Sequence, residues 1–420
     1  MFTVGLLLVL LLALAAEFLN GATDAGNAIA TVVSTRVLRP LPAVLLAAVL
    51  NFAGAMAGTG VALTIANGFI DPSANVPLHA IAAAMTAILL WGTTAWYFGM
   101  PISKSHALVS GLTGAGMAVA GPGALLVSGW QKVGMGLLFS TFLGFGFGHL
   151  LIIIVLWTCR KLLHGTVRRV FGRMQLLSAS YMAFEHGRND GQKFMGVLVL
   201  AVVLTMTAGR SFRVIDPGDT TLTADQKMTA SEADAVVADL NEGARWPTFE
   251  HKQREQPWWA VRMKVQNPGD SALKEGAVVT PLDVRHAVLS VPKGKKKPEA
   301  KPVVPVWVIL ICAATMALGT SMGGWRIIRT MGLRMVKLET YHGFAAETAA
   351  ATAIGIASHW GIPLSTTHTI NTAIMGVGAS KRLSAVRWGV AGDIVSAWVM
   401  TFPICFILGY AIAWVFHHLA

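Results

Sequence analysis

Two acidic side chains stand in the middle of long apolar stretches. Asp24 lies within the run 4–35, and Asp190 lies within the run 175–208. A carboxylate at the centre of a bilayer costs about 2.5–3.5 kcal/mol on insertion scales, so it needs a bound cation, a proton or a basic partner. We therefore predict that both aspartates carry a coupling ion or proton. The alternative is that each is a structural residue capping a break in its helix.

Two proline motifs interrupt two further apolar stretches, 79–120 and 341–379. Residues 101–106 read PISKSH, and residues 363–368 read PLSTTH. A proline at the start of a half-helix is followed by backbone N–H groups without helical partners, and such a helix start with nearby hydroxyls binds anions. Two such starts facing each other would surround one tetrahedral oxyanion. The predicted substrate-binding hydroxyls are those of Ser103, Ser105, Ser365, Thr366 and Thr367; alternatively, they only satisfy the broken backbone.

Three basic side chains lie in or beside these motifs. Lys104, Arg188 and Lys193 could bind the substrate anion or hold the two aspartates ionised, or else extend to the membrane interface. Glu347 is another isolated acid in an apolar run, and we predict a cation or proton role for it.

A histidine closes each proline motif. His106 and His368 either relay protons or orient the hairpins. The cysteines Cys159, Cys312 and Cys405 have neither metal-site nor disulfide spacing. We assign no metal ligand, no catalytic residue and no cofactor.

The composition is that of a membrane protein with one polar insert. The chain has 420 residues, of which 54% are hydrophobic and 13% charged. The segment 210–302 holds 28 of the charges, whereas the rest of the chain, more than three times as long, holds only 26. This distribution excludes a disordered chain and is unlike a soluble enzyme. The basic excess lies between apolar runs, which indicates membrane topology rather than nucleic-acid binding.

The chemical motifs occur twice in the same order. The segment 20–27 (NGATDAGN) matches 186–193 (HGRNDGQK), and each is followed by a proline motif and then by a Gly-x-Gly triplet at the same distance from the motif histidine. Along the chain, the distance from Asp190 to Pro363 exceeds the distance from Asp24 to Pro101 by about the length of the insert. We predict an all-α polytopic membrane protein with two inverted-topology repeats, each with a broken helix and a re-entrant Pro-Ser/Thr hairpin.

The repeats define five segments. The first transmembrane repeat is 1–158, and a basic cytoplasmic loop, 159–174, follows it. The second repeat starts with 175–209 and continues with 303–420. Between these two parts lies a small extramembrane insert, 210–302, which is predicted to be periplasmic. The loops 36–39, 160–173, 326–337 and 381–387 hold most of the basic side chains outside the insert. The positive-inside rule makes these loops cytoplasmic and places the N-terminus and the insert outside.

At these motifs the sequence resembles the inorganic phosphate transporter (PiT) family and, within it, the bacterial low-affinity phosphate permeases. The resemblance implies a secondary active phosphate symporter of the cytoplasmic (inner) membrane, embedded in lipid and homodimeric, with alternating access at a midplane site. By matching position, it implies that Asp24, Asn27, Asp190, Glu347 and the hairpin hydroxyls are coordinating residues.

The sequence departs from the family pattern at two positions. Lys104 stands where Ser or Thr is usual, and Lys193 stands where the first repeat has Asn27. An ammonium beside Asp190 would compete with sodium. The form of 186–193 also resembles that of bacterial members described as proton-coupled carriers of phosphate, often as a neutral metal–phosphate complex. The resemblance therefore implies proton coupling, with phosphate carried alone or as a complex with a divalent metal. The alternatives are sodium coupling, a sulfate or other oxyanion permease of the same fold and, last, a passive oxyanion channel or a membrane enzyme. The sequence lacks a nucleophile–base motif, so we predict that it is not an enzyme.

Overall fold

The computed structural model describes residues 4–70, 76–207, 304–380 and 382–419, together with four short strands between residues 211 and 290. The chain divides into two compact units. One comprises Met1–Ala201 with Val306–Ala420, and the other comprises Val202–Pro305. The predicted insert 210–302 falls in the second unit, where most residues lie outside the described ones. There β1 (Ser211–Ile215) pairs in parallel with β4 (His286–Ser290), and β2 (Met263–Lys264) pairs antiparallel with β3 (Val278–Val279).

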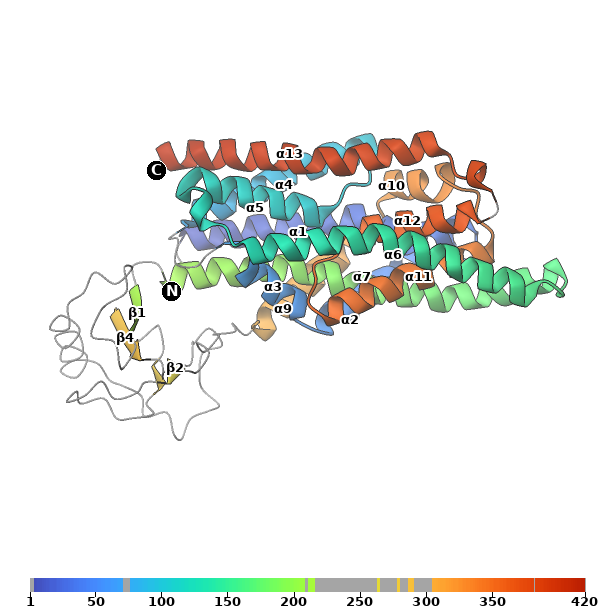
Figure 1. Cartoon of the computed structure of the whole chain (residues 1–420), viewed down its shortest axis with the longest axis horizontal. Helices are drawn as coiled ribbons and strands as arrows, with labels where there is room; N and C mark the ends of the chain where they lie inside the picture. Colours follow the sequence, from blue (N-terminus) through green and yellow to red (C-terminus); the bar gives the residue numbers. More distant parts are fainter. Residues whose placement is uncertain are drawn as a thin grey trace. The chain divides into compact units, whose positions relative to one another are not determined.

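The larger unit is a helical bundle in which the long helices lie roughly parallel or antiparallel to one another (Figure 1). Its first half contains α1 (Val4–Ser34), α2 (Pro40–Met56), α3 (Gly60–Gly68), α4 (Leu78–Phe98), α5 (Lys104–Ala120), η2 (Pro122–Ala124) and α6 (Val127–Cys159). Its second half contains α7 (His164–Thr207), α9 (Val306–Ser321), α10 (Trp325–Arg329), η3 (Thr330–Arg334), α11 (Thr340–His359), α12 (Thr366–Ala379), η4 (Leu383–Ala385) and α13 (Trp388–Leu419).

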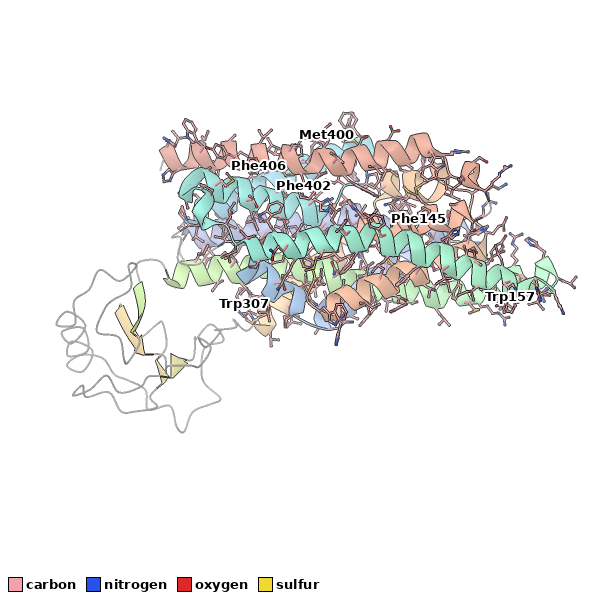
Figure 2. The ribbon with its side chains drawn as sticks, in the orientation of Figure 1. Phe145, Trp157, Trp307, Met400, Phe402 and Phe406 are labelled. Atoms are coloured by element: carbon pink, nitrogen blue, oxygen red, sulfur yellow. The ribbon has the colours of Figure 1, made fainter. Side chains whose placement is uncertain are left out.

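Several of these helices are long and apolar enough to cross a membrane. In the described part of the chain, α1, α4, α6 and α13 meet this criterion, and two bent pairs bring the number of spans to as many as six. The pair α2–α3 bends by 67°, and the pair of α9 with α10–η3 bends by 59°. The prediction of an all-helical, multi-span membrane protein is confirmed. The bilayer accounts for the exposed apolar side chains on the outer helices, such as Met400 on α13 and Trp157 on α6 (Figure 2).

The bends are not at the aspartates. Both α1 and α7 are continuous helices through Asp24 and Asp190. The alternative role of each aspartate as a cap at a helix break is therefore wrong. The break between α9 and α10 lies at Gly323 and Gly324, whose φ angles of 86° and 50° favour glycine.

The two proline motifs do interrupt their helices, as predicted. Ser103 precedes α5 and its side chain accepts a hydrogen bond from the His106 backbone N–H (3.3 Å). Ser365 precedes α12 and accepts from the His368 N–H in the same way (3.3 Å). Each serine is thus the N-cap of the helix that follows the break. At 17 and 14 residues, α5 and α12 are shorter than a full membrane span, while α4 has 21 residues.

Each of these two short helices packs against the long helix that ends the other half of the chain. α5 lies against α13, and α12 lies against α6. A Cβ atom added to Gly114 on α5 would lie less than 3.0 Å from the Phe406 carbonyl oxygen, and one added to Gly376 on α12 would lie equally close to the Phe145 carbonyl oxygen. These glycines stand at equivalent positions in the two repeats. They are therefore required for the helices to approach so closely.

We predict that Gly114→Ala destabilises the protein and that Gly116→Ala does not. The new methyl at position 114 would meet backbone, which cannot move out of the way, whereas a Cβ at position 116 would meet nothing closer than 3.7 Å. Overpacking of this kind costs about 1–3 kcal/mol. Thermal unfolding of the two purified variants in detergent measures the difference. Equal midpoints would contradict the packing described for α5 and α13.

Candidate functional site

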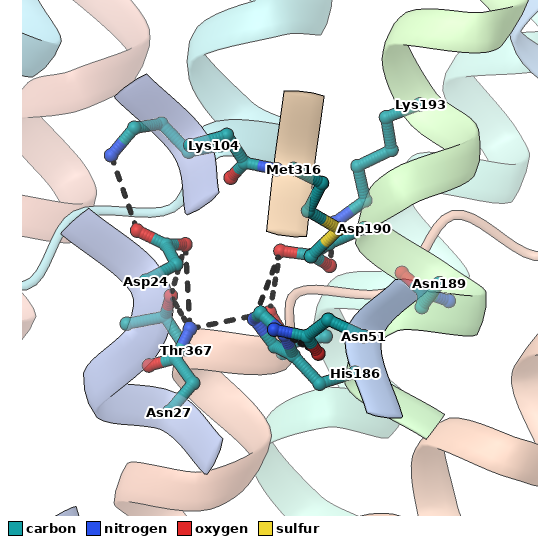
Figure 3. A network of polar contacts seen from close by, with 12 residues as sticks. Asp24, Asn27, Asn51, Lys104, His186, Asn189, Asp190, Lys193, Met316 and Thr367 are labelled. Atoms are coloured by element: carbon teal, nitrogen blue, oxygen red, sulfur yellow. Dashed lines mark hydrogen bonds and ion pairs between the residues drawn. The ribbon is translucent and has the colours of Figure 1, made fainter. Parts of the chain in front are cut away.

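The two aspartates, the two lysines and the two hairpin tips meet in the interior of the bundle (Figure 3). Asp24 on α1 is 3% exposed. Its Oδ1 atom lies 3.3 Å from Lys104 Nζ, and its Oδ2 atom accepts from Asn27 Nδ2 (3.3 Å) and Thr367 Oγ1 (3.4 Å). Lys104 Nζ also donates to Thr23 Oγ1 at 2.8 Å. α1, α5 and α12 together therefore surround this carboxylate.

Asp190 on α7 is likewise paired with a lysine and with a threonine of the second hairpin tip. It is fully buried, and its Oδ1 atom accepts from Lys193 Nζ at 2.6 Å. Its Oδ2 atom accepts from Thr366 Oγ1 (3.0 Å) and lies 3.6 Å from His186 Nε2. Lys193 Nζ also donates to the Leu364 carbonyl (3.1 Å), which ties α7 to the second hairpin tip.

The basic residues predicted beside the motifs separate into two groups. Lys104 and Lys193 are 2% and 0% exposed, so neither ammonium extends to the membrane interface. Each pairs with one aspartate, and the four formal charges cancel. Arg188 is directed elsewhere: its Nη1 atom lies 3.3 Å from Glu185 Oε1, and a quarter of its side chain is exposed. The structure does not bring Arg188 to the aspartates.

The two hairpin tips contact each other through a reciprocal pair of hydrogen bonds. Ser105 Oγ donates to the Leu364 carbonyl (3.2 Å), and Thr367 Oγ1 donates to the Ile102 carbonyl (3.3 Å), sharing its single proton with Asp24 Oδ2. In both cases the donor is the fifth residue of its own motif, and the acceptor is the second residue of the other motif. The starts of α5 and α12 thus meet head to head. Their first N–H groups have no partner within the helix, so the tips present donors for an anion.

The two motif histidines lie together within an aromatic cluster. The His106 and His368 rings meet edge to face, with centroids 4.5 Å apart. His106 stacks on Phe402 and His368 stacks on Trp398, both from α13. His106 Nδ1 and both ring nitrogens of His368 have no hydrogen-bond partner in the described part of the chain. The packing suits the hairpin-orienting role, because stacked rings hold the tips against α13.

His186 is a site residue that the sequence analysis did not select. Asn51 Nδ2 donates to Thr320 Oγ1 (3.0 Å), which turns the Asn51 carbonyl oxygen toward His186 Nδ1 at 3.1 Å. Nδ1 therefore carries the proton, and the Nε2 lone pair is left without a hydrogen bond beside Asp190. Ligand atoms of His186 and of the two aspartates lie within 4.8 Å of one another, close enough to hold one metal ion. The sequence-based assignment of no metal ligand does not anticipate this cluster.

Glu347 occupies a separate buried position on α11. Its carboxylate accepts from Thr31 Oγ1 (2.5 Å), Gln175 Nε2 (3.2 Å) and the Ser178 hydroxyl. Thr31 follows Asp24 by two helical turns, or about 10 Å along α1. The predicted cation or proton residues therefore divide into a central group of Asp24, Asn27 and Asp190 and an outlying Glu347 with its own polar shell.

Comparison with known proteins identifies the family. Residues 20–165 and 160–409 match the model of the phosphate transporter family. The chain is 36% identical to a probable low-affinity inorganic phosphate transporter of Rhizobium meliloti, over 92% of this chain and 89% of the relative. It is 32% identical to a protein of the same description from Bacillus subtilis, over 96% and 94% of the two chains.

A solved structure supports the fold. The chain resembles the structure described as the sodium-dependent phosphate transporter, with a TM-score of 0.69 over the full length of both chains and 20% identity. The family match and the two relatives at 36% and 32% identity agree with the membrane helices and the buried polar site. The chain therefore belongs to the phosphate transporter family and is a transmembrane transporter, not an enzyme.

Proposed function

We propose that this chain imports inorganic phosphate by proton-coupled symport, with alternating access at the site between α1, α7 and the two hairpin tips. The observation that carries the proposal is the meeting of two helix starts, rich in hydroxyls, beside two ion-paired aspartates. The helix starts and the hydroxyls suit a tetrahedral oxyanion. The lysines supply positive charge, and the aspartates supply groups that a proton or cation can neutralise. A sulfate-type oxyanion would fit the same donors and is the alternative substrate.

Inverted repeats are the architecture that we propose for this transport. Asp24 and Asp190 occupy equivalent places in α1 and α7, and the reciprocal hydrogen bonds between the tips are what a pseudo-twofold axis would produce. The basic connections gather at one end, where Arg36, Arg168 and Arg387 line one cavity. By the positive-inside rule this end is cytoplasmic, so the N-terminus and the insert are proposed to lie on the outer side of the inner membrane. We also propose a homodimer, on the family resemblance alone.

Charge balance favours protons or a divalent metal as the companion of phosphate. The charges of the two aspartates and the two lysines cancel, so these four residues do not compensate the two negative charges that a phosphate dianion would bring into the buried site, which is costly. Two protons or one divalent cation would cancel them. Sodium at Asp190 would carry a single charge and would compete with the Lys193 ammonium, which lies 2.6 Å from the carboxylate. A proton can be taken up by a carboxylate with less rearrangement, and a divalent cation competes with its higher charge, so we favour both over sodium.

We predict that Asp24→Asn and Asp190→Asn each reduce phosphate uptake to background while the protein still inserts into membranes. Either change removes a group that accepts the coupling charge and leaves one buried lysine unpaired. Uptake of labelled phosphate into proteoliposomes measures the effect, with the exposed Asp393→Asn as the matched control. Uptake near the wild-type rate in either variant would contradict the assignment.

The coupling ion is tested on the wild-type protein in the same proteoliposomes. We expect an inward proton gradient without sodium to drive accumulation, and an inward sodium gradient at equal pH to have no effect. Accumulation that requires sodium and ignores pH would overturn proton coupling and leave phosphate transport standing. Passive flux without accumulation would identify a channel.

We further propose that the transported species includes a metal–phosphate complex, with the metal as cargo. Two carboxylates and the His186 imidazole nitrogen form a suitable ligand set, and the metal would free the lysines to face the phosphate. Imidazole favours zinc more than magnesium, whereas carboxylates bind both. His186 is buried and its orientation is fixed by Asn51, so its lone pair is positioned before any metal arrives.

We predict that His186→Gln weakens the stimulation of phosphate uptake by zinc more than that by magnesium. Loss of one ligand or its support costs about 10–100-fold in metal affinity in known sites. The measurement is the metal concentration for half-maximal uptake in chelator-treated proteoliposomes. His79→Gln, outside the central site, is the control. An equal change for both metals, or none, would remove His186 from the proposed cargo site.

A further inference from the structure

A basic cavity lies at the end of the helical unit where the arginine- and lysine-rich connections meet. It has a volume of about 990 Å³. Its lining comes from the end of α1, the start of α7, the η3–α11 connection and the α12–α13 connection. The basic residues in the described lining are Arg36, Arg168, Lys337, Arg382 and Arg387.

The lining carries a strong excess of positive charge. Five basic side chains face one acidic residue, Glu339, whose carboxylate is already occupied as the N-cap of α11, where it accepts the His342 backbone N–H. Across the described residues, none of the five basic side chains forms an ion pair with an acidic one. Like charges gathered around one cavity repel each other, so an anion bound among them would relieve that repulsion.

Arg36 has a backbone conformation that supports a ligand-binding role. The α1 helix ends in a Schellman motif, in which the Arg36 N–H donates to the Val33 carbonyl (3.1 Å) and the Val37 N–H donates to the Val32 carbonyl (3.1 Å). The position that Arg36 occupies in this motif is normally glycine. Arg36 has a φ of 62°, the one positive φ of a non-glycine residue in the described ranges. The chain thus holds Arg36 in a backbone conformation that side-chain-bearing residues rarely adopt, and this conformation lies at the wall of the cavity.

The cavity is separate from the aspartate site but is connected to it through polar contacts. Thr35, in the cavity wall, donates from Oγ1 to Gln175 Oε1 at 2.9 Å. Gln175 Nε2 in turn donates to Glu347 at 3.2 Å. Asp24 and Thr31 lie on α1, and Thr35 directly follows its last residue, so polar groups extend from the central site to the cavity wall.

We propose that this cavity is a second anion site, which binds a multivalent, phosphate-bearing anion. Its size is at the upper end of the range for small-molecule sites, larger than one orthophosphate needs. Its cations come from four segments, so they suit several phosphate groups spread over one ligand. Arginine is the side chain that best pairs with such groups. A soluble polyphosphate and the headgroup of a diphosphate lipid share this chemistry, and the experiment separates them.

The test is calorimetric titration of the full-length protein in detergent with inorganic pyrophosphate at low ionic strength. We expect Arg36→Ala/Arg168→Ala to weaken binding about tenfold or more, since two charge-assisted contacts are lost. The matched control is Arg39→Ala/Arg169→Ala, which removes two exposed arginines from the same end and the same connections but outside the described lining. We expect the control to bind as the wild type does.

Repeating the titration in lipid nanodiscs identifies the source of the ligand. If cardiolipin in the nanodisc blocks pyrophosphate binding and neutral lipid does not, the resident anion is a lipid headgroup. If pyrophosphate binds equally in both, it is a soluble anion. The site is overturned if the wild type binds no pyrophosphate in detergent, or if both double variants weaken binding equally. Because the readout is binding, these outcomes are independent of proton coupling and phosphate uptake.

Discussion

The central constraint on this structure is the neutralisation of two buried carboxylates by two buried ammonium groups. Asp24 and Asp190 lie in the interior of the bundle, and each would be prohibitively unstable as an isolated charge. Lys104 comes from a hairpin tip, whereas Lys193 comes from the same helix as its aspartate. The two ion pairs therefore have different mechanical consequences. Moving the first hairpin away from α1 separates Lys104 from Asp24, while the pair on α7 remains intact.

The hairpin tips share this dependence on the aspartates. Thr366 and Thr367 at the start of α12 donate to Asp190 and Asp24 respectively, so one helix start contacts both carboxylates. The first tip contributes Lys104, and the second contributes hydroxyls. Protonation or cation binding at Asp24 would thus change what holds both tips in place, and at Asp190 it would change what holds the second tip. In the proposed mechanism, these contacts would link the coupling charge to the conformational change that alternating access requires.

The repeated motifs allowed much of the site to be predicted from sequence, and helix geometry explains what was missed. The aspartates and the proline breaks follow from residue type and local spacing, whereas Ser103 and Ser365, predicted to bind substrate, are the N-caps of α5 and α12. The sequence alone left open whether the helix breaks at Asp190, so the faces on which its neighbours lie could not be assigned. On a continuous helix His186, Asp190 and Lys193 share one face, whereas Arg188 points to the opposite face, where Glu185 lies. A prediction that assumed a continuous helix would therefore have excluded Arg188 from the site.

Other features depend on contacts that no local pattern contains. The free nitrogen of His186 is determined by Asn51, which is distant in sequence, and Asn51 is oriented by Thr320 on a third helix. The shell around Glu347 is assembled from α1 and α7, and the basic cavity from four segments that are distant in sequence. Each of these features uses residues of α1 or α7, the helices that carry the aspartates.

The two aspartate helices thus position the central ion pairs and also a row of polar groups leading from them toward the basic end. Thr31, Thr35 and Gln175 belong to this row. Glu347 stands in this row between the aspartates and the basic cavity, fully buried and held by hydroxyl and amide donors from α1 and α7. A change of charge at Glu347 would therefore act on the same two helices that hold Asp24 and Asp190.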